Sequence, residues 1–265
     1  MGIIFARTRF NYADPDSGFG SYVDFWKLVE LSGFATCYVD EIDPASDNVY
    51  IFSPSNGETE NGWPDARARI IHWNLEQDAY PPIPGVAETW VSDKRLAERI
   101  GAKYVPMGSH EDLAGPTAIP YPQRARSFDV IMLAYRTPRR MWAQVEMAKQ
   151  GVLIAPDGWH AARRTALLAS SAMLHVHQTE GKCFVAPQRF ALAAAYGLPL
   201  ITETLADPGI FYSTTLLSSD LLNLPAFVKM WTQARERQLL EDYGYQLHRL
   251  LCHVWPFRRC VEEAL

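Results

Sequence analysis

The chain has 265 residues, of which 48% are hydrophobic and 21% charged, enough apolar material for one large domain or two small ones. Its formal net charge of −5 argues against non-specific binding to nucleic acid or an anionic membrane, although a local basic patch can override the total. Arg7 and Arg9 come too early for a signal sequence, and no apolar run is long enough to cross a bilayer. We therefore expect a cytoplasmic protein without a membrane span.

The first part of the chain alternates short apolar runs with polar loops. Strands are expected at residues 2–5, 35–39, 49–52, 70–73, 88–91 and 103–106. Helices are expected from Ser21, which stands in capping-box spacing with Asp24, to Gly33, and again over residues 93–100. A loop rich in turn formers, residues 11–20, follows the first strand. This alternation is typical of a parallel α/β layer.

A change in composition divides the chain. Residues 108–123 contain Gly115, Pro116, Pro120 and Pro122 and show no periodicity, which favours an interdomain linker. We therefore predict one domain over residues 1–122 and a second over residues 123–265.

The strand and helix pattern restarts after this segment. Strands are expected at residues 129–134, 152–154, 172–176 and 198–201. Helices are expected at residues 139–150, 161–170, 225–237 and 241–265, the last interrupted by Pro256, and an alanine-rich helix ends at Gly197. The fold class predicted is therefore α/β, with two Rossmann-like parallel-sheet domains that face a cleft. The last helix is expected to pack back on the first domain.

Residues 174–208 are the most informative stretch, because they form a strand–loop–helix–strand unit. Such units bind ligands at the carboxyl ends of their strands, where a helix N-terminus favours an anion. Polar side chains gather in the loop and the first helical turn: His177, Gln178, Glu180, Lys182, Gln188 and Arg189. Half of a nucleotide-sugar site is therefore predicted here.

A metal site is not expected. The four cysteines (Cys37, Cys183, Cys252 and Cys260) are scattered without a Cys-x-x-Cys pair, which favours free thiols. His175 and His177 face the same side of a strand, but no third ligand stands at metal-binding spacing beside them.

Five motifs in order along the chain carry a family resemblance. They are Ser17-Gly-Phe-Gly-Ser, Tyr104-Val-Pro-Met-Gly-Ser-His, Arg136-Thr-Pro-Arg-Arg, Arg189-Phe-Ala-Leu-Ala-Ala-Ala-Tyr-Gly-Leu-Pro-Leu and His253-Val-Trp-Pro-Phe-Arg-Arg. Together they resemble glycosyltransferases of the GT-B class, above all its compact bacterial and viral members of the CgeB-like or glycosyltransferase group 1 type.

The resemblance implies a donor domain in the C-terminal half, which binds a nucleotide-diphosphate sugar, and an acceptor domain in the N-terminal half. It implies no cofactor and no metal, and in a viral protein a location in the host cytoplasm. Arginines at a helix start oppose the macrodipole, yet they match phosphate oxygens well. The candidate donor-binding residues are Gly20, Arg136, Arg139, Arg140, His177, Gln178, Glu180, Arg189 and Glu203. Leu192 stands where many relatives have a ribose-binding glutamate, so Arg189, Glu180 or Glu203 would have to compensate.

Glu76, Asp16 and His110 are the candidate catalytic residues. Glu76 follows a strand of the first half, Asp16 lies in the first loop, and His110 lies at the mouth of the linker. An inverting enzyme would need one of them as a general base, whereas a retaining enzyme would depend on stabilisation from the donor side.

Two alternatives stay open. One is a viral transferase that glycosylates a hydroxylated base in DNA, for which a basic cleft could be built from the arginines at 124, 126, 136, 139, 140, 163 and 164. The other is a nucleotide-sugar binding module without catalysis. The acceptor and the oligomeric state are left open.

Overall fold

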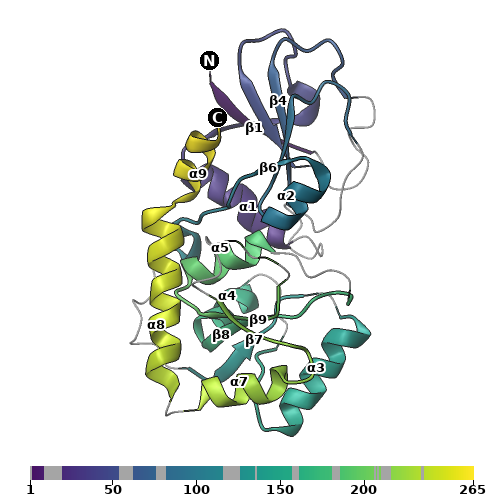
Figure 1. The fold of residues 1–265 in the computed structure, drawn as a ribbon. Helices are drawn as coiled ribbons and strands as arrows, with labels where there is room; N and C mark the ends of the chain where they lie inside the picture. Colours follow the sequence, from purple (N-terminus) through teal and green to yellow (C-terminus); the bar gives the residue numbers. More distant parts are fainter. Residues whose placement is uncertain are drawn as a thin grey trace.

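The computed structural model describes residues 2–8, 20–53, 62–75, 82–115, 126–134, 136–156, 161–180, 186–205, 207, 209, 216–233 and 236–265. Figure 1 shows two groups of strands and helices, one above the other, with the C-terminal helices running alongside both. Among the described residues, every helix is too short or too polar to cross a membrane.

The first sheet is wholly parallel and has the strand order β2-β1-β3-β4-β5-β6. Its strands are β1 (Ile3–Arg7), β2 (Ala35–Tyr38), β3 (Val49–Phe52), β4 (Arg69–Asn74), β5 (Glu88–Val91) and β6 (Lys103–Tyr104). Helices α1 (Gly20–Leu31) and α2 (Lys94–Ile100) and the 3-10 turn η1 (Val39–Glu41) connect them. The central strands β3 and β4 are almost entirely buried. β3 is accordingly a continuous apolar run in the sequence, whereas β4 also buries the polar residues His72 and Asn74.

The second sheet is also parallel, in the order β10-β9-β8-β7. Its strands are β7 (Phe128–Ile131), β8 (Ser170–His175), β9 (Leu200–Glu203) and β10 (Leu216–Ser219). Its helices are α3 (Pro138–Lys149), α4 (Ala161–Leu168), α5 (Pro187–Ala195) and α7 (Leu224–Thr232). The two parallel sheets confirm the α/β class, and most predicted elements are present within a few residues.

Four details differ from the sequence predictions. The strand expected at residues 152–154 is a single parallel bridge from Ile154 to Val130. The strand β10 was not expected. The last long helix begins at Arg237 rather than at residue 241. The helix α1 begins at Gly20, one residue before Ser21, and the side chain of Asp24 forms an ion pair with Arg163 of α4.

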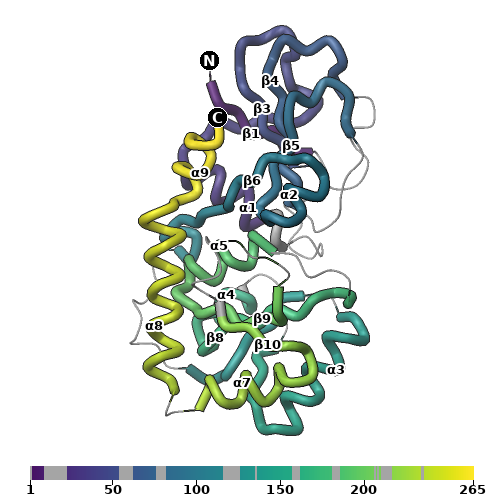
Figure 2. Tube along the Cα trace, in the orientation of Figure 1, coloured from purple at the N-terminus to yellow at the C-terminus, as the bar shows by residue number. Residues whose placement is uncertain are grey.

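The C-terminal helices connect the two halves. Helix α8 (Arg237–His248) continues into the π-helix η4 (Arg249–Val254), and α9 (Phe257–Ala264) follows Pro256. Figure 2 shows α8 beside the second sheet and α9 beside β1 and α1. The ring of Phe257 lies 5.9 Å from that of Phe5, 5.7 Å from that of Phe25 and 5.6 Å from that of Trp73, so α9 packs into the core of the first half.

The start of the predicted linker is tightly packed. At Gly108 a Cβ atom would lie 2.1 Å from the carbonyl oxygen of Trp255, so no side chain fits there. Ser109 donates its backbone N–H to Leu251 and its hydroxyl to the carbonyl of Ala191, at 2.9 and 2.6 Å. The short helix η2 (Glu111–Ala114) follows. The largest buried cluster is continuous across this junction, from Phe5 in β1 to residues of α5.

Candidate functional site

The second sheet reverses its winding direction beside β7. After β7 the chain passes through α3 to the Ile154 bridge on one side of that strand and then returns through α4 to β8 on the other side. The carboxyl ends of strands at such a switch point are where open α/β sheets bind ligands. Here these ends lead into residues 132–140 and 176–180, which contain three of the predicted donor-binding arginines (Arg136, Arg139 and Arg140) and His177.

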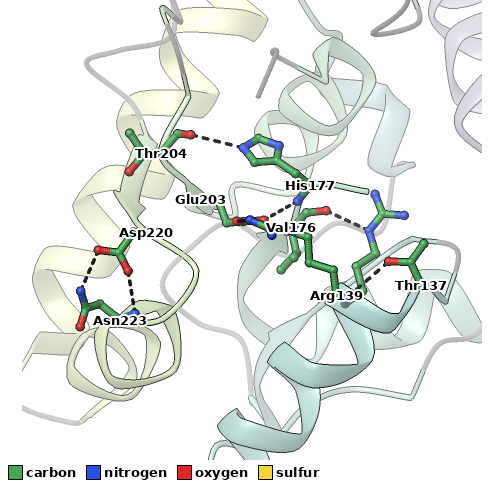
Figure 3. Close-up of polar contacts among 9 residues, drawn as sticks. Thr137, Arg139, Val176, His177, Glu203, Thr204, Asp220 and Asn223 are labelled. Atoms are coloured by element: carbon green, nitrogen blue, oxygen red, sulfur yellow. Dashed lines mark hydrogen bonds and ion pairs between the residues drawn. The ribbon is translucent and has the colours of Figure 1, made fainter. Parts of the chain in front are cut away.

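Glu203 is the centre of a polar cluster at this edge. It is the last residue of β9 and only 3% of its surface is exposed. The Arg139 side chain forms an ion pair with its carboxylate at 2.5 Å, and the backbone N–H of His177 donates to its other oxygen at 2.7 Å (Figure 3). One buried carboxylate thereby fixes the start of α3 and the end of β8 relative to β9.

Arg140 is buried beside this pair. Its Nε donates to the carbonyl oxygen of Val176 at 2.9 Å. Burial lowers the pKa of its guanidinium, while the charge of Glu203 raises it. Thr137 caps α3 by accepting the N–H of Arg140 at 3.4 Å, and Pro138 opens the helix with a favourable φ. The local sequence Thr137-Pro138-Arg139-Arg140 therefore aims two cations at the switch point.

Two buried histidines complete this edge. Burial is the main cause that lowers the pKa of both His175 and His177, so both rings are neutral at neutral pH. The charge of Arg189, on the first turn of α5, adds to the lowering at His175, which places that guanidinium close by. The ring of His177 lies 3.3 Å from the carbonyl oxygen of Thr204. Within the described ranges, neither ring nitrogen of His175 has a hydrogen-bond partner.

Three guanidinium groups gather around one carboxylate in this cluster. They belong to Arg139, Arg140 and Arg189, and the carboxylate is that of Glu203. The two histidines of this edge add no charge, because burial lowers their pKa. Such an edge is suited to an anion with several oxygens, since guanidinium groups bind phosphate oxygens in pairs.

The first half of the molecule contacts the start of α5, beside this cluster, through the residue that follows β4. Leu75 directly follows β4, and its carbonyl oxygen accepts the side-chain amide of Gln188 at 3.3 Å. Gln188 neighbours Arg189 on the first turn of α5. The carboxyl end of β4 therefore contacts the N-terminus of α5, so segments from both sheets meet beside the cluster.

The remaining predicted residues fall into three groups. Arg136, Gln178 and Glu180 are exposed, in the segments that follow β7 and β8. His110 caps η2 by accepting the N–H of Asp112 at 3.2 Å, and Gly20 is the first residue of α1. Glu76 and Asp16 lie outside the described residues.

Three further residues that the sequence analysis singled out have structural roles. Leu192, at the position of the missing glutamate, belongs to the buried core. Arg126 donates to the carbonyls of Ser170 and Ser171 at 3.0 and 2.8 Å, and Arg163 is paired with Asp24. These two arginines of the predicted basic cleft therefore make contacts within the protein, Arg126 with the start of β8 and Arg163 with α1.

Solved structures of similar fold were found, although no protein-family model and no curated protein sequence matches the chain. AviGT4, a glycosyltransferase involved in avilamycin A biosynthesis, matches with a TM-score of 0.58 and 11% identity over 99% of this chain and 95% of its own. An α-glucosyltransferase in complex with UDP and a 13-mer DNA gives 0.56 and 9%, over 99% and 97%. The β-glucosyltransferase of phage T4 gives 0.56 and 12%, over 100% and 98%.

These likenesses cover nearly the whole of both chains in each comparison, at very low sequence identity. They establish the fold: the chain has the two-domain α/β architecture of the GT-B class, as the sequence motifs predicted.

Proposed function

We propose that the protein is a glycosyltransferase that moves a sugar from a nucleotide-diphosphate sugar to an acceptor hydroxyl. The observation that carries this proposal is the cluster around Glu203, which lies at the switch point of the second sheet and brings three guanidinium groups to one carboxylate. A nucleotide diphosphate is an anion that guanidinium groups bind well. The whole-chain likeness to glycosyltransferases of known structure supports the same class of reaction.

In this proposal the arginines neutralise the diphosphate as it leaves the sugar. Arg139 and Arg140 bind the phosphate oxygens from the start of α3, and Arg189 binds them from the start of α5. Fixed donors aimed at a developing charge lower the barrier without a metal ion. Glu203 keeps Arg139 in position and has lone pairs left for a hydroxyl group of the donor. Arg136, His177, Gln178, Glu180 and Gly20 stay predictions as donor contacts.

The acceptor is proposed to approach from the first half. Support comes from the contact between Gln188 and Leu75, because Leu75 directly precedes Glu76 in the sequence. Glu76 and Asp16 are the proposed alternatives for a general base in an inverting reaction, and His110 is a third. The sugar, the nucleotide and the stereochemistry are left open, and the location proposed is the cytoplasm.

A second candidate is a transferase that modifies DNA. It is favoured by the structural neighbour that was solved with UDP and a 13-mer DNA. It is disfavoured by the net charge of −5 and by the structural use of Arg126 and Arg163. Binding to duplex DNA that falls steeply with rising salt would support this candidate, and absence of such binding would leave a different acceptor.

The first experiment measures thermal stabilisation of the purified protein by a panel of nucleotides and nucleotide sugars, with and without EDTA. A shift given by one diphosphate nucleotide, and equal in EDTA, supports a donor site that needs no metal. Slow hydrolysis of the matching nucleotide sugar would then separate an enzyme from a module that only binds it. No shift with any nucleotide would contradict the proposed donor site.

A further inference from the structure

We propose a binding site for a divalent transition-metal ion of the Zn²⁺ type at the junction of the two halves, formed by Glu111, His248 and His253. One ligand atom from each of these residues lies within 4.8 Å of the other two. The Nε2 atoms of the two histidines are 3.2 Å apart. Glu111 comes from η2, which follows the first sheet. His248 directly precedes the π-helix η4, and His253 lies within it. None of the three belongs to the cluster around Glu203.

A hydrogen bond to the backbone indicates the tautomer of His248. Its Nδ1 lies 2.9 Å from the carbonyl oxygen of Ala194, which can only accept a hydrogen bond. Nδ1 therefore carries the proton, and the lone pair of Nε2 points toward His253. Histidines that bind metals usually donate their second N–H to a backbone carbonyl in this way, which orients the ring.

The spacing of the two nitrogens fits a tetrahedral ion. Two ligand atoms about 2.05 Å from a tetrahedral Zn²⁺ lie about 3.3 Å from one another. The observed 3.2 Å separation is close to this value. Glu111 and His253 are exposed, so small rotations of their side chains would complete three ligands and leave the fourth position to water. Two imidazoles and a carboxylate favour Zn²⁺ or Co²⁺ over Mg²⁺.

The π-helix is an independent observation that supports the site. Residues five apart on an α-helix differ by about 140° around its axis, so their side chains do not meet. The π-helix Arg249–Val254 carries the i→i+5 repeat that places His248 and His253 on one face, with ring centroids 5.0 Å apart. π-helical turns are rare in proteins and are frequently found at functional sites.

An ion held here would cross-link the junction. Glu111 lies two residues after Ser109, whose N–H donates to Leu251 inside the π-helix. The ion would therefore link η2 to the C-terminal helices, residues 237–264, whose last helix α9 packs into the first half. Because bound metal stabilises only the folded state, its effect is a higher unfolding temperature.

The test begins with protein stripped of metal and titrates Zn²⁺ alone, by calorimetry and by thermal unfolding. We expect one equivalent to bind with a rise in unfolding temperature, Co²⁺ to give the visible spectrum of a tetrahedral site, and Mg²⁺ to have no effect. His253→Gln and Glu111→Gln should each weaken Zn²⁺ binding by at least about tenfold. Both residues are exposed, so both variants are expected to fold.

Glu262→Gln serves as the matched control. Glu262 is an exposed carboxylate of the C-terminal helix α9, and it forms an ion pair with Arg258. Its Zn²⁺ affinity should equal that of the parent. If Zn²⁺ does not bind stoichiometrically, or binds His253→Gln as tightly as the parent, the proposal is wrong. The two imidazoles would then be joined only by their own hydrogen bond.

Discussion

Two largely buried ion pairs of arginine with a carboxylate, both within the described part of the chain, lie in different settings. Arg163 and Asp24, with side chains 13% and 17% exposed, join α4 of the second half to α1 of the first. Arg139 and Glu203, 23% and 4% exposed, lie at the carboxyl edge of the second sheet. Burial raises the pKa of Asp24 in spite of Arg163 and Lys27, so the loss of water around this carboxylate outweighs the attraction of both cations.

The difference shows how a structural ion pair can be told from a binding site of similar chemistry. Asp24 has Arg163 and, more weakly, Lys27 as its cations, so its charge is matched locally. Glu203 faces Arg139 and influences Arg140, and the histidine that donates to it is neutral. A buried pair alone is weak evidence for either stability or function. The second pair is marked by its place at the carboxyl edge of a sheet, where three guanidinium groups lie around one carboxylate.

The largest effect is expected from Arg163→Ala. It leaves the buried carboxylate of Asp24 without its main partner, which should lower the free energy of unfolding by about 3–5 kcal/mol. Urea denaturation measures this loss. The parallel variant Arg139→Ala should cost less, because Glu203 keeps the N–H of His177 and the nearby charge of Arg140. If the two variants lose the same free energy of unfolding, the two ion pairs do not differ in their contribution to stability.

Acid should destabilise the protein through His72, a buried histidine of the first half that stacks on Phe52. Burial lowers its pKa from 6.5 to about 4. Below pH 6.5, the pKa of this histidine in the unfolded chain, the unfolded chain binds a proton that the folded protein does not bind. The contribution to stability is therefore fully present above pH 6.5, and it is lost as the pH falls toward the folded pKa of about 4. The gap corresponds to about 3 kcal/mol.

The variant His72→Gln isolates this effect, because glutamine does not titrate. Urea denaturation at about pH 7 and about pH 4 should show a smaller acid loss in the variant than in the parent, by about 3 kcal/mol. His175 and His177 titrate in the same direction and leave a residual loss in both proteins. An unchanged acid loss in the variant would show that His72 is protonated without cost in the folded state.

Apolar replacement of each ion pair sharpens the comparison further. Asp24→Leu with Arg163→Met should leave the protein folded and its nucleotide affinity unchanged, since well-packed apolar residues often replace a buried pair without loss. Glu203→Leu with Arg139→Met should also fold, but it should weaken binding of the diphosphate nucleotide by about 1.5–3 kcal/mol. Calorimetric titration of both double variants measures this. Full affinity in the second would contradict the proposed donor site.

The sequence predicts elements better than it predicts contacts between them. Alternation of apolar and polar runs located most strands and helices, because that signal is local. Glu203 and Arg139 were both candidates, but their pairing spans 64 residues and appears only once the sheet order is known. The contact from Arg163 to Asp24 spans 139 residues and gave no sequence signal. The π-helix was missed for a related reason, since its contact with α5 joins segments that are far apart in the sequence.

The smallest effect, and the sharpest for the donor site, is expected from Arg189→Ala. Arg189 lies on the first turn of α5, close enough to His175 to lower its pKa. Loss of one charged hydrogen bond should weaken binding of the diphosphate nucleotide by at least ~1.5 kcal/mol, about tenfold, with little change in unfolding temperature. Arg99→Ala, at an exposed position of α2, is the matched control. If the two variants bind the nucleotide equally well, Arg189 does not touch the donor, and the anion would have to be held by α3 alone.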